Sequence, residues 1–98
     1  MAIEISVYPN PFEHYLMLEI TCQEALDCII LLADLQQGKI IRMLGASLKS
    51  GINRVPLDDL QNLSAGNYQL DIKTAAADPV YNTRLFKQSV EGPVIHLN

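Results

Sequence analysis

The sequence has little positive charge, no tryptophan and no long apolar run, and each absence excludes a class of function. Seven Lys and Arg residues stand against eleven Asp and Glu residues in 98, which gives a net charge of −4. Binding to nucleic acid or to anionic lipid needs clustered cations, so we expect neither partner. The longest apolar run, Cys28 to Ala33, has six residues. A membrane-spanning helix needs about 20, so no membrane insertion is expected.

Residues that build metal sites and catalytic centres are also scarce. The two cysteines, Cys22 and Cys28, lie six positions apart, and only His14 and His96 could join them. A zinc site needs four ligands, usually in closely spaced pairs. Neither a phosphate-binding glycine loop nor an HExxH motif is present. We therefore expect no metal site, no cofactor and no enzymatic activity, and so no catalytic, cofactor-binding or metal-binding residues.

The two cysteines leave two alternatives open. A disulfide across a hairpin is compatible with their spacing, because such a bond needs Cα atoms within about 7 Å. We favour the other alternative, in which Cys22 and Cys28 are half-buried thiols that act as small hydrophobic side chains.

Alternation of apolar and polar residues predicts β-strands along most of the chain. The first strand, Ile3 to Val7, must end near Tyr8, because the prolines that follow lack amide donors. Further strands are expected at residues 15–22, 28–35, 39–44, 52–57, 67–73 and 80–90. Pro56 cannot donate to a ladder and marks an edge or a bulge. Seven such strands predict an all-β fold, an immunoglobulin-like β-sandwich of antiparallel strands.

Two connections carry more specific expectations. Residues 23–27 have the length of a hairpin loop. Residues 58–66 form a crossing loop, in which Leu60 and Leu63 cover one end of the core. Tyr68 follows this loop at the place where a tyrosine corner ties a loop to a strand through the phenol hydroxyl.

Several blocks of sequence occur in an order and spacing that resemble a known family. They are Val7 to Phe12 (VYPNPF), Ala33 to Ile41 (ADLQQGKII), Leu60 to Leu70 (LQNLSAGNYQL) and Arg84 to Lys87 (RLFK). Together they resemble the C-terminal sorting domain of the type IX (Por) secretion system, and the resemblance covers residues 4 to about 88. The resemblance divides the chain into an immunoglobulin-like sorting-type domain, residues 1–88, and a C-terminal extension, residues 89–98.

The resemblance implies a non-catalytic C-terminal sorting domain that directs an exported protein through the type IX secretion system to the cell surface. Its implied partners are the receptor and the sortase of the secretion machinery. The family positions expected to hold turns and core are Pro9, Asn10, Pro11, Phe12, Asp34, Gly38, Lys39, Gly66 and Tyr68. Arg84 and Lys87 are expected on the surface as receptor contacts.

A stand-alone immunoglobulin-like interaction domain, in the cytoplasm or the cell envelope, is the alternative function, and glycan binding by an exposed strand face is disfavoured by the absence of tryptophan. The first residues show no secretory signal. We therefore expect a secreted or cell-surface location as part of a larger precursor, and a cytoplasmic one if this chain is complete. A homodimer through an edge strand or through the tail at residues 93–97 is a further expectation, with a frayed tail as its alternative.

Overall fold

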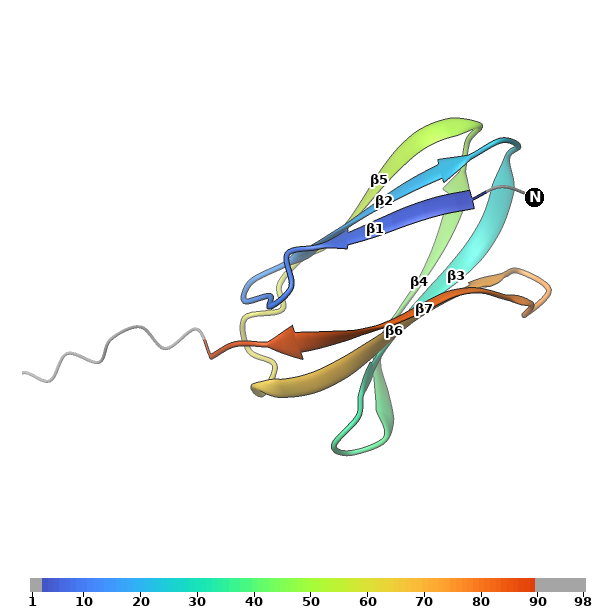
Figure 1. Ribbon diagram of the computed structural model, residues 1–98. Coiled ribbons are helices and arrows are strands. Elements are labelled where there is room, and N and C mark those ends of the chain that lie inside the picture. Colours follow the sequence, from blue (N-terminus) through green and yellow to red (C-terminus); the bar gives the residue numbers. More distant parts are fainter. Residues whose placement is uncertain (1–2, 90–98) are drawn as a thin grey trace, which may run out of the picture.

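The computed structural model describes residues 3–89, and this part of the chain folds into two packed β-sheets with no helix. The strands are β1 (Ile3–Tyr8), β2 (Leu16–Cys22), β3 (Leu26–Asp34), β4 (Lys39–Leu48), β5 (Gly51–Leu57), β6 (Gly66–Thr74) and β7 (Pro79–Lys87). One sheet has the order β1-β2-β5 and the other has the order β4-β3-β6-β7 (Figure 1). All five pairings between the named strands are antiparallel, so the prediction of an all-β sandwich is confirmed. No helix long and apolar enough to cross a membrane occurs in the described residues.

The strand order differs by one strand from that of a constant-type immunoglobulin domain. In that domain the fourth strand pairs with the fifth, whereas here β4 pairs with β3 and extends the larger sheet. The finer description as immunoglobulin-like therefore stays a prediction beside the confirmed two-layer architecture.

Two of the expected elements differ from the structure. Residues 23–27 do not form a hairpin loop, because β2 lies in one sheet and β3 in the other, and the chain crosses between layers there. The fourth strand continues from Leu44 to Leu48, where Leu48 is buried and keeps the alternation of inward and outward side chains. The expected strand at 80–90 ends at Lys87, and the predicted tail strand at 93–97 lies outside the described residues.

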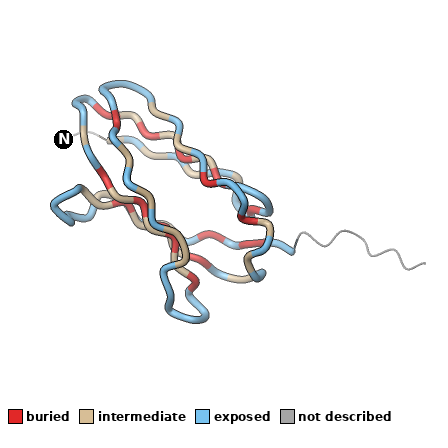
Figure 2. The backbone as a smooth tube through the Cα atoms, turned by 180° about the vertical axis from the view of Figure 1, so that it is seen from behind, coloured by how far each residue is buried: buried red, intermediate tan, exposed pale blue. Residues whose placement is uncertain are grey.

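The core lies between the sheets and consists of alternate residues of the strands at the centre of each sheet. Figure 2 shows buried and less buried positions alternating along the strands. Its most buried aliphatic strand residues come from β2, β3 and β6: Leu16, Leu18, Ile20, Ile30, Leu32, Leu70 and Ile72. Phe12 and Leu60, from two loops, are buried as completely. Each fully buried aliphatic side chain contributes about 1.5–3 kcal/mol, and this set supplies most of the driving force for packing the two layers.

Both cysteines are buried as free thiols, Cys22 at the end of β2 and Cys28 in β3. Burial raises the pKa of Cys28 above its ordinary value, and the nearby Cys22 and Asp27 raise it further. A thiol held in its protonated form is a poor nucleophile and packs as a small hydrophobic group. The preferred interpretation of the two cysteines as free thiols that pack as hydrophobic groups is confirmed, but both are buried rather than half-buried.

Leu18→Ala and Leu70→Ala should each lower the free energy of unfolding by about 2–5 kcal/mol, because both side chains are fully buried and alanine leaves a cavity. Urea unfolding followed by circular dichroism measures the change. Ser6→Ala, at an exposed position of β1, is the control and should shift stability by less than about 0.5 kcal/mol. Equal stability of all three variants would contradict this strand register.

Candidate functional site

Residues of all four sequence blocks meet at one end of the sandwich. Because the pairings are antiparallel, β1, β3, β5 and β7 end there, and β2, β4 and β6 begin there (Figure 1). We call this the motif end, formed by loops 9–15, 35–38 and 58–65 together with the last residues of β7. The blocks are separated by tens of residues in the sequence, and the fold brings them to one place.

The first loop docks onto the end of the last strand through main-chain hydrogen bonds. The Phe12 amide donates to the Phe86 carbonyl at 2.9 Å, and the Gln88 amide donates to the Phe12 carbonyl at 2.8 Å. The Phe86 amide donates to the side-chain Oδ1 of Asn10 at 2.9 Å. Phe12 thereby forms an isolated parallel bridge with Lys87 and covers the outer edge of β7.

Pro9 and Pro11 shape this loop because they lack amide hydrogens. Neither has an amide hydrogen, so neither can extend the ladder between β1 and β2, and both follow cis peptide bonds. The chain leaves β1 after Tyr8 and enters β2 only at Leu16. The intervening residues are consequently available to bond with β7.

Phe12 and Tyr68 fill the core beneath this loop. Both are buried, and their rings meet edge to face with centroids 5.8 Å apart and an interplanar angle of 71°. The Tyr68 hydroxyl donates to the Ser64 carbonyl at 2.6 Å, which confirms the expected tie between strand and crossing loop. Burial raises the pKa of Tyr68, and the carboxylate of Asp34 raises it further.

Asp34 organises the turn between β3 and β4. Its Oδ1 accepts hydrogen bonds from the amides of Gln36, at 2.8 Å, and Gln37, at 3.3 Å. The amide of Gly38 donates to the Asp34 carbonyl at 2.8 Å, and Gly38 has φ of 68°, a conformation that glycine adopts without strain. Lys39 follows as the exposed first residue of β4, so this part of the family pattern is a hairpin turn.

Gly66 lets this turn approach the start of β6. It has φ of 144°, and a side chain added there would collide with the side chain of Gln36. The Leu35 amide donates to the Asn67 carbonyl at 3.1 Å beside it. The absence of a side chain at Gly66 therefore permits contact between two loops of the motif end.

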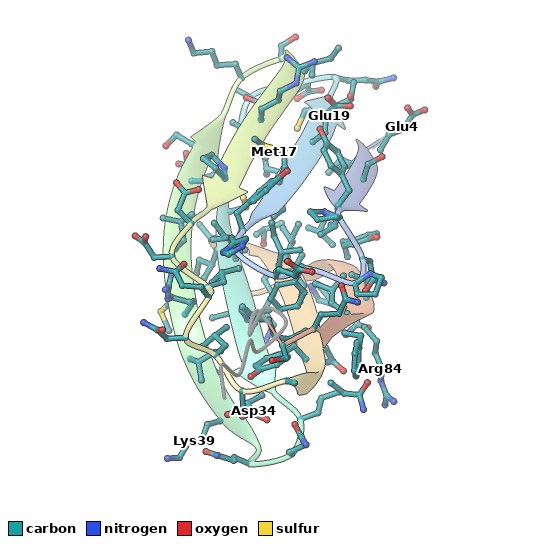
Figure 3. The ribbon with its side chains drawn as sticks, turned by 90° about the vertical axis from the view of Figure 1, so that its left-hand side faces the viewer. Glu4, Met17, Glu19, Asp34, Lys39 and Arg84 are labelled. Atoms are coloured by element: carbon teal, nitrogen blue, oxygen red, sulfur yellow. The ribbon has the colours of Figure 1, made fainter. Side chains whose placement is uncertain are left out.

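The two cationic residues of the last strand have different environments, and one expectation about them is wrong. Arg84 is exposed on β7 (Figure 3). Lys87 is fully buried, and its ammonium group donates to the Gln88 carbonyl at 2.7 Å. The expected surface position is incorrect for Lys87, because the first loop covers the end of β7 and encloses the lysine stem.

Sequence reasoning missed Arg42, which fixes the crossing loop to the larger sheet. Its guanidinium donates to the carbonyls of Asp58, at 3.0 Å, and Asp59, at 2.8 Å. Leu60, predicted to cover the core, is fully buried just after these residues, and its amide donates to the His14 carbonyl at 2.9 Å. The carbonyls that accept from Arg42 lie 16 and 17 residues further along the chain, so no local sequence pattern could have indicated these hydrogen bonds.

The described part of the chain offers no cluster of side chains suited to hold a metal ion. A depression of about 380 Å³ lies at the opposite end of the sandwich, lined by Ile3, Thr74, Asp78, Pro79 and Val80. It contains one carboxylate and no second titratable group to act with it. The motif end presents a firmly connected surface of loops and a strand end, which suits recognition by another protein.

Comparison with known proteins identifies a family for most of the chain. The model of the secretion system C-terminal sorting domain matches residues 6–87. A comparison with curated proteins found no match. Among solved structures, a GH3 β-glucosidase from Bifidobacterium adolescentis superposes with a TM-score of 0.53 at 14% identity. That match covers 99% of this chain but 18% of the enzyme chain, and it shows a shared fold alone.

Gly66→Val should lower the free energy of unfolding by about 1–3 kcal/mol, because valine is strained at this φ and meets Gln36. Gly45→Val is the matched control: Gly45 lies in β4 with open space around it, and valine favours strands there. A Gln36→Ala change added to Gly66→Val should recover part of the loss by removing the collision. Equal stability of Gly66→Val and Gly45→Val would show that the turn does not need glycine.

Tyr68→Phe should make the free energy of unfolding fall less steeply with rising pH in the alkaline range. An acid whose pKa is raised by folding keeps a proton that the unfolded chain has released, so stability falls as pH rises above the unfolded value of about 10. Below that pH the protonated phenol contributes fully. Urea unfolding between pH 8 and pH 11 measures the slope, and Tyr15→Phe, which removes an exposed phenol, is the control. An equally steep decline in Tyr68→Phe and the wild type would contradict the assignment.

Proposed function

Because the chain belongs to the family of secretion system C-terminal sorting domains, we propose that it directs an exported protein through the type IX machinery to the cell surface. Family membership itself assigns a C-terminal sorting role in type IX secretion and a secreted or cell-surface precursor. A non-catalytic role fits that membership. The finer proposal names the receptor and the sortase of the machinery as its partners. The alternative of a stand-alone interaction domain gains no support from the comparisons.

The observation that carries the proposal is the convergence of the family blocks at the motif end. Two hydrogen bonds join Asn10 and Phe12 to Phe86 of β7, a third joins Phe12 to Gln88 just after it, and the Phe12 ring packs on Tyr68. These contacts fix the end of the last strand relative to both sheets. A receptor that binds here recognises a folded arrangement rather than a linear segment, so unfolding of the domain would remove the signal.

Arg84 is the residue we propose as a receptor contact. It is exposed on β7, and no hydrogen bond or ion pair within the described residues engages its guanidinium. An unpaired guanidinium binds carboxylate or phosphate groups through two parallel hydrogen bonds. Lys87, in contrast, supports the end of the strand from inside and acts on recognition only through the shape it maintains.

The direct test fuses residues 1–98, and separately residues 1–88, behind a reporter that carries an export signal, in a bacterium that has type IX machinery. We expect both fusions to reach the cell surface or the medium, because both contain the matched residues 6–87. Fractionation into periplasm, outer membrane and medium measures the result. Retention of both folded fusions in the periplasm would overturn the proposed function.

The same fusion tests Arg84 separately. Arg84→Gln should reduce export about tenfold or more if its guanidinium makes a charge-assisted contact, which is worth about 1.5–3 kcal/mol. Arg54→Gln is the control, since Arg54 is an exposed arginine of the other sheet that pairs with Glu19 at 2.9 Å. Undiminished export of Arg84→Gln would remove this contact and leave the sorting role in place.

A further inference from the structure

The edge strand β4 is less protected than the other three sheet edges. Proline limits each of the others: Pro9 follows β1, Pro56 lies within β5, and Pro79 begins β7. The far end of β7 is also covered by Asn10 and Phe12. β4 has ten residues and no proline. In residues 3–89, no main-chain hydrogen bond joins β4 to any segment except β3. An exposed edge of this kind is a template for pairing with another chain.

The devices that do protect β4 act only near its first residues. Leu32 and Ala33 of β3 pair with Arg42 and Ile40, so Ile41 is the extra residue of a bulge that makes the start of β4 irregular. Arg42 does not place its charge over the edge, because its guanidinium bonds the carbonyls of Asp58 and Asp59. The segment Arg42–Leu48 is consequently a regular edge with unpaired outward amides and carbonyls, and Arg42, which is turned toward the crossing loop, is its one charged side chain.

An apolar surface lies beside this edge, on the outer face of the larger sheet. Met43 is 67% exposed and Ile40 is 56% exposed. Met43 pairs with Leu31 and Ile40 pairs with Ala33, so the apolar positions of the two strands are adjacent. Exposed apolar side chains that cluster, rather than occur singly, indicate an interaction surface.

Charge is distributed unevenly along the chain and favours one kind of occupant. Residues 35–57 contain four of the seven basic residues and none of the eleven acidic residues, although the whole chain has a net charge of −4. Within this segment Lys39 begins β4 and Lys49 directly follows it, and no side chain of the described residues pairs with the ammonium group of either lysine. The Asn53 side chain bonds only the main-chain amide and carbonyl of Lys49. A second copy docked edge to edge would bring like charges together. An acidic partner would be attracted instead.

We propose that the edge of β4 from Arg42 to Leu48 accepts an extended segment of a partner protein by β-strand addition. The segment has an apolar centre and an Asp or Glu residue at each end. Its main chain pairs with the free amides and carbonyls of β4, its apolar side chains cover Met43 and Ile40, and its carboxylates meet Lys39 and Lys49. β4 and β7 are opposite edges of the same sheet, so the edge Arg42–Leu48 lies away from Arg84, and the two proposed contacts share only Lys39 (Figure 3).

The test uses isotopically labelled full chain, residues 1–98, and a synthetic peptide with alternating valine and threonine in the centre and two glutamates at each end. Amide chemical shifts and hydrogen exchange should change at 42–48 and not along β1, β5 or β7. A peptide with lysine in place of glutamate, and one with a central proline, should each bind about tenfold more weakly or worse. If the amide chemical shifts do not change at peptide concentrations up to about 1 mM, any binding has a Kd weaker than about 1 mM and the proposal is overturned.

Substitutions distinguish binding at the β4 edge from nonspecific binding to apolar surface. Met43→Ser removes an apolar contact without adding charge and should weaken binding of the acidic peptide about tenfold. Ile52→Ser, at a similarly exposed site on the other sheet, should leave it unchanged within about twofold. Changing Lys39 and Lys49 together to Glu should reverse the preference between acidic and basic peptides. If these substitutions leave peptide binding unchanged, the proposal of an acidic partner segment is overturned. A concentration-dependent dimer through β4, seen by sedimentation without peptide, would overturn it as well.

Discussion

The docking of Phe12 onto the last strand is the contact on which the motif end depends. β1 and β7 belong to different sheets, and elsewhere the layers meet mainly through side chains. At Phe12 they are joined by main-chain hydrogen bonds to Phe86 and Gln88, while the aromatic ring is buried against Tyr68. Exposing the buried Phe12 ring to water would cost free energy, and the main-chain hydrogen bonds hold the end of β7 next to that ring. The loop, the crossing segment and the end of β7 are thus one connected unit.

This connection explains why most family positions have structural roles. Asp34 holds a turn, Gly66 allows two loops to meet, and Tyr68 secures the crossing loop through Ser64. Such residues determine the shape of the motif end without themselves being available to a partner. Under the proposed function, recognition relies on the smaller set of exposed groups that this frame positions. Arg84 and Lys39 are cations of this set, and Glu13, Asp58 and Asp59 are exposed carboxylates of it.

The free edge of β4 faces a different direction from the motif end. Natural sheets protect their edges because unpaired amides and carbonyls invite association. The chain places proline at three edges and leaves the longest strand without it. The motif end and the β4 edge are thus the two surfaces of this small domain that we propose as interaction sites, one defined by loops and one by a strand.

The alternation of apolar residues was sufficient to predict the number of strands and most of the core. Leu16, Leu18, Leu70 and Ile72 recur with period two, and this periodicity is a local property of a strand with one buried face. The edge position of Pro56 follows in the same way from its missing amide hydrogen. The loop at 23–27 was misjudged because loop length does not reveal whether the next strand joins the same sheet.

What the sequence alone determined is the local chemistry: strand periodicity, turn glycines, proline breaks and the ordered family blocks. Only the tertiary structure decided which strands share a sheet, that Lys87 is enclosed, and that Arg42 reaches the carbonyls of Asp58 and Asp59. The physical reason is that backbone conformation responds to neighbouring residues. Burial and hydrogen-bond partners arise from contacts between segments tens of residues apart, and lysine, with its long apolar stem, suits a surface or a covered position equally well.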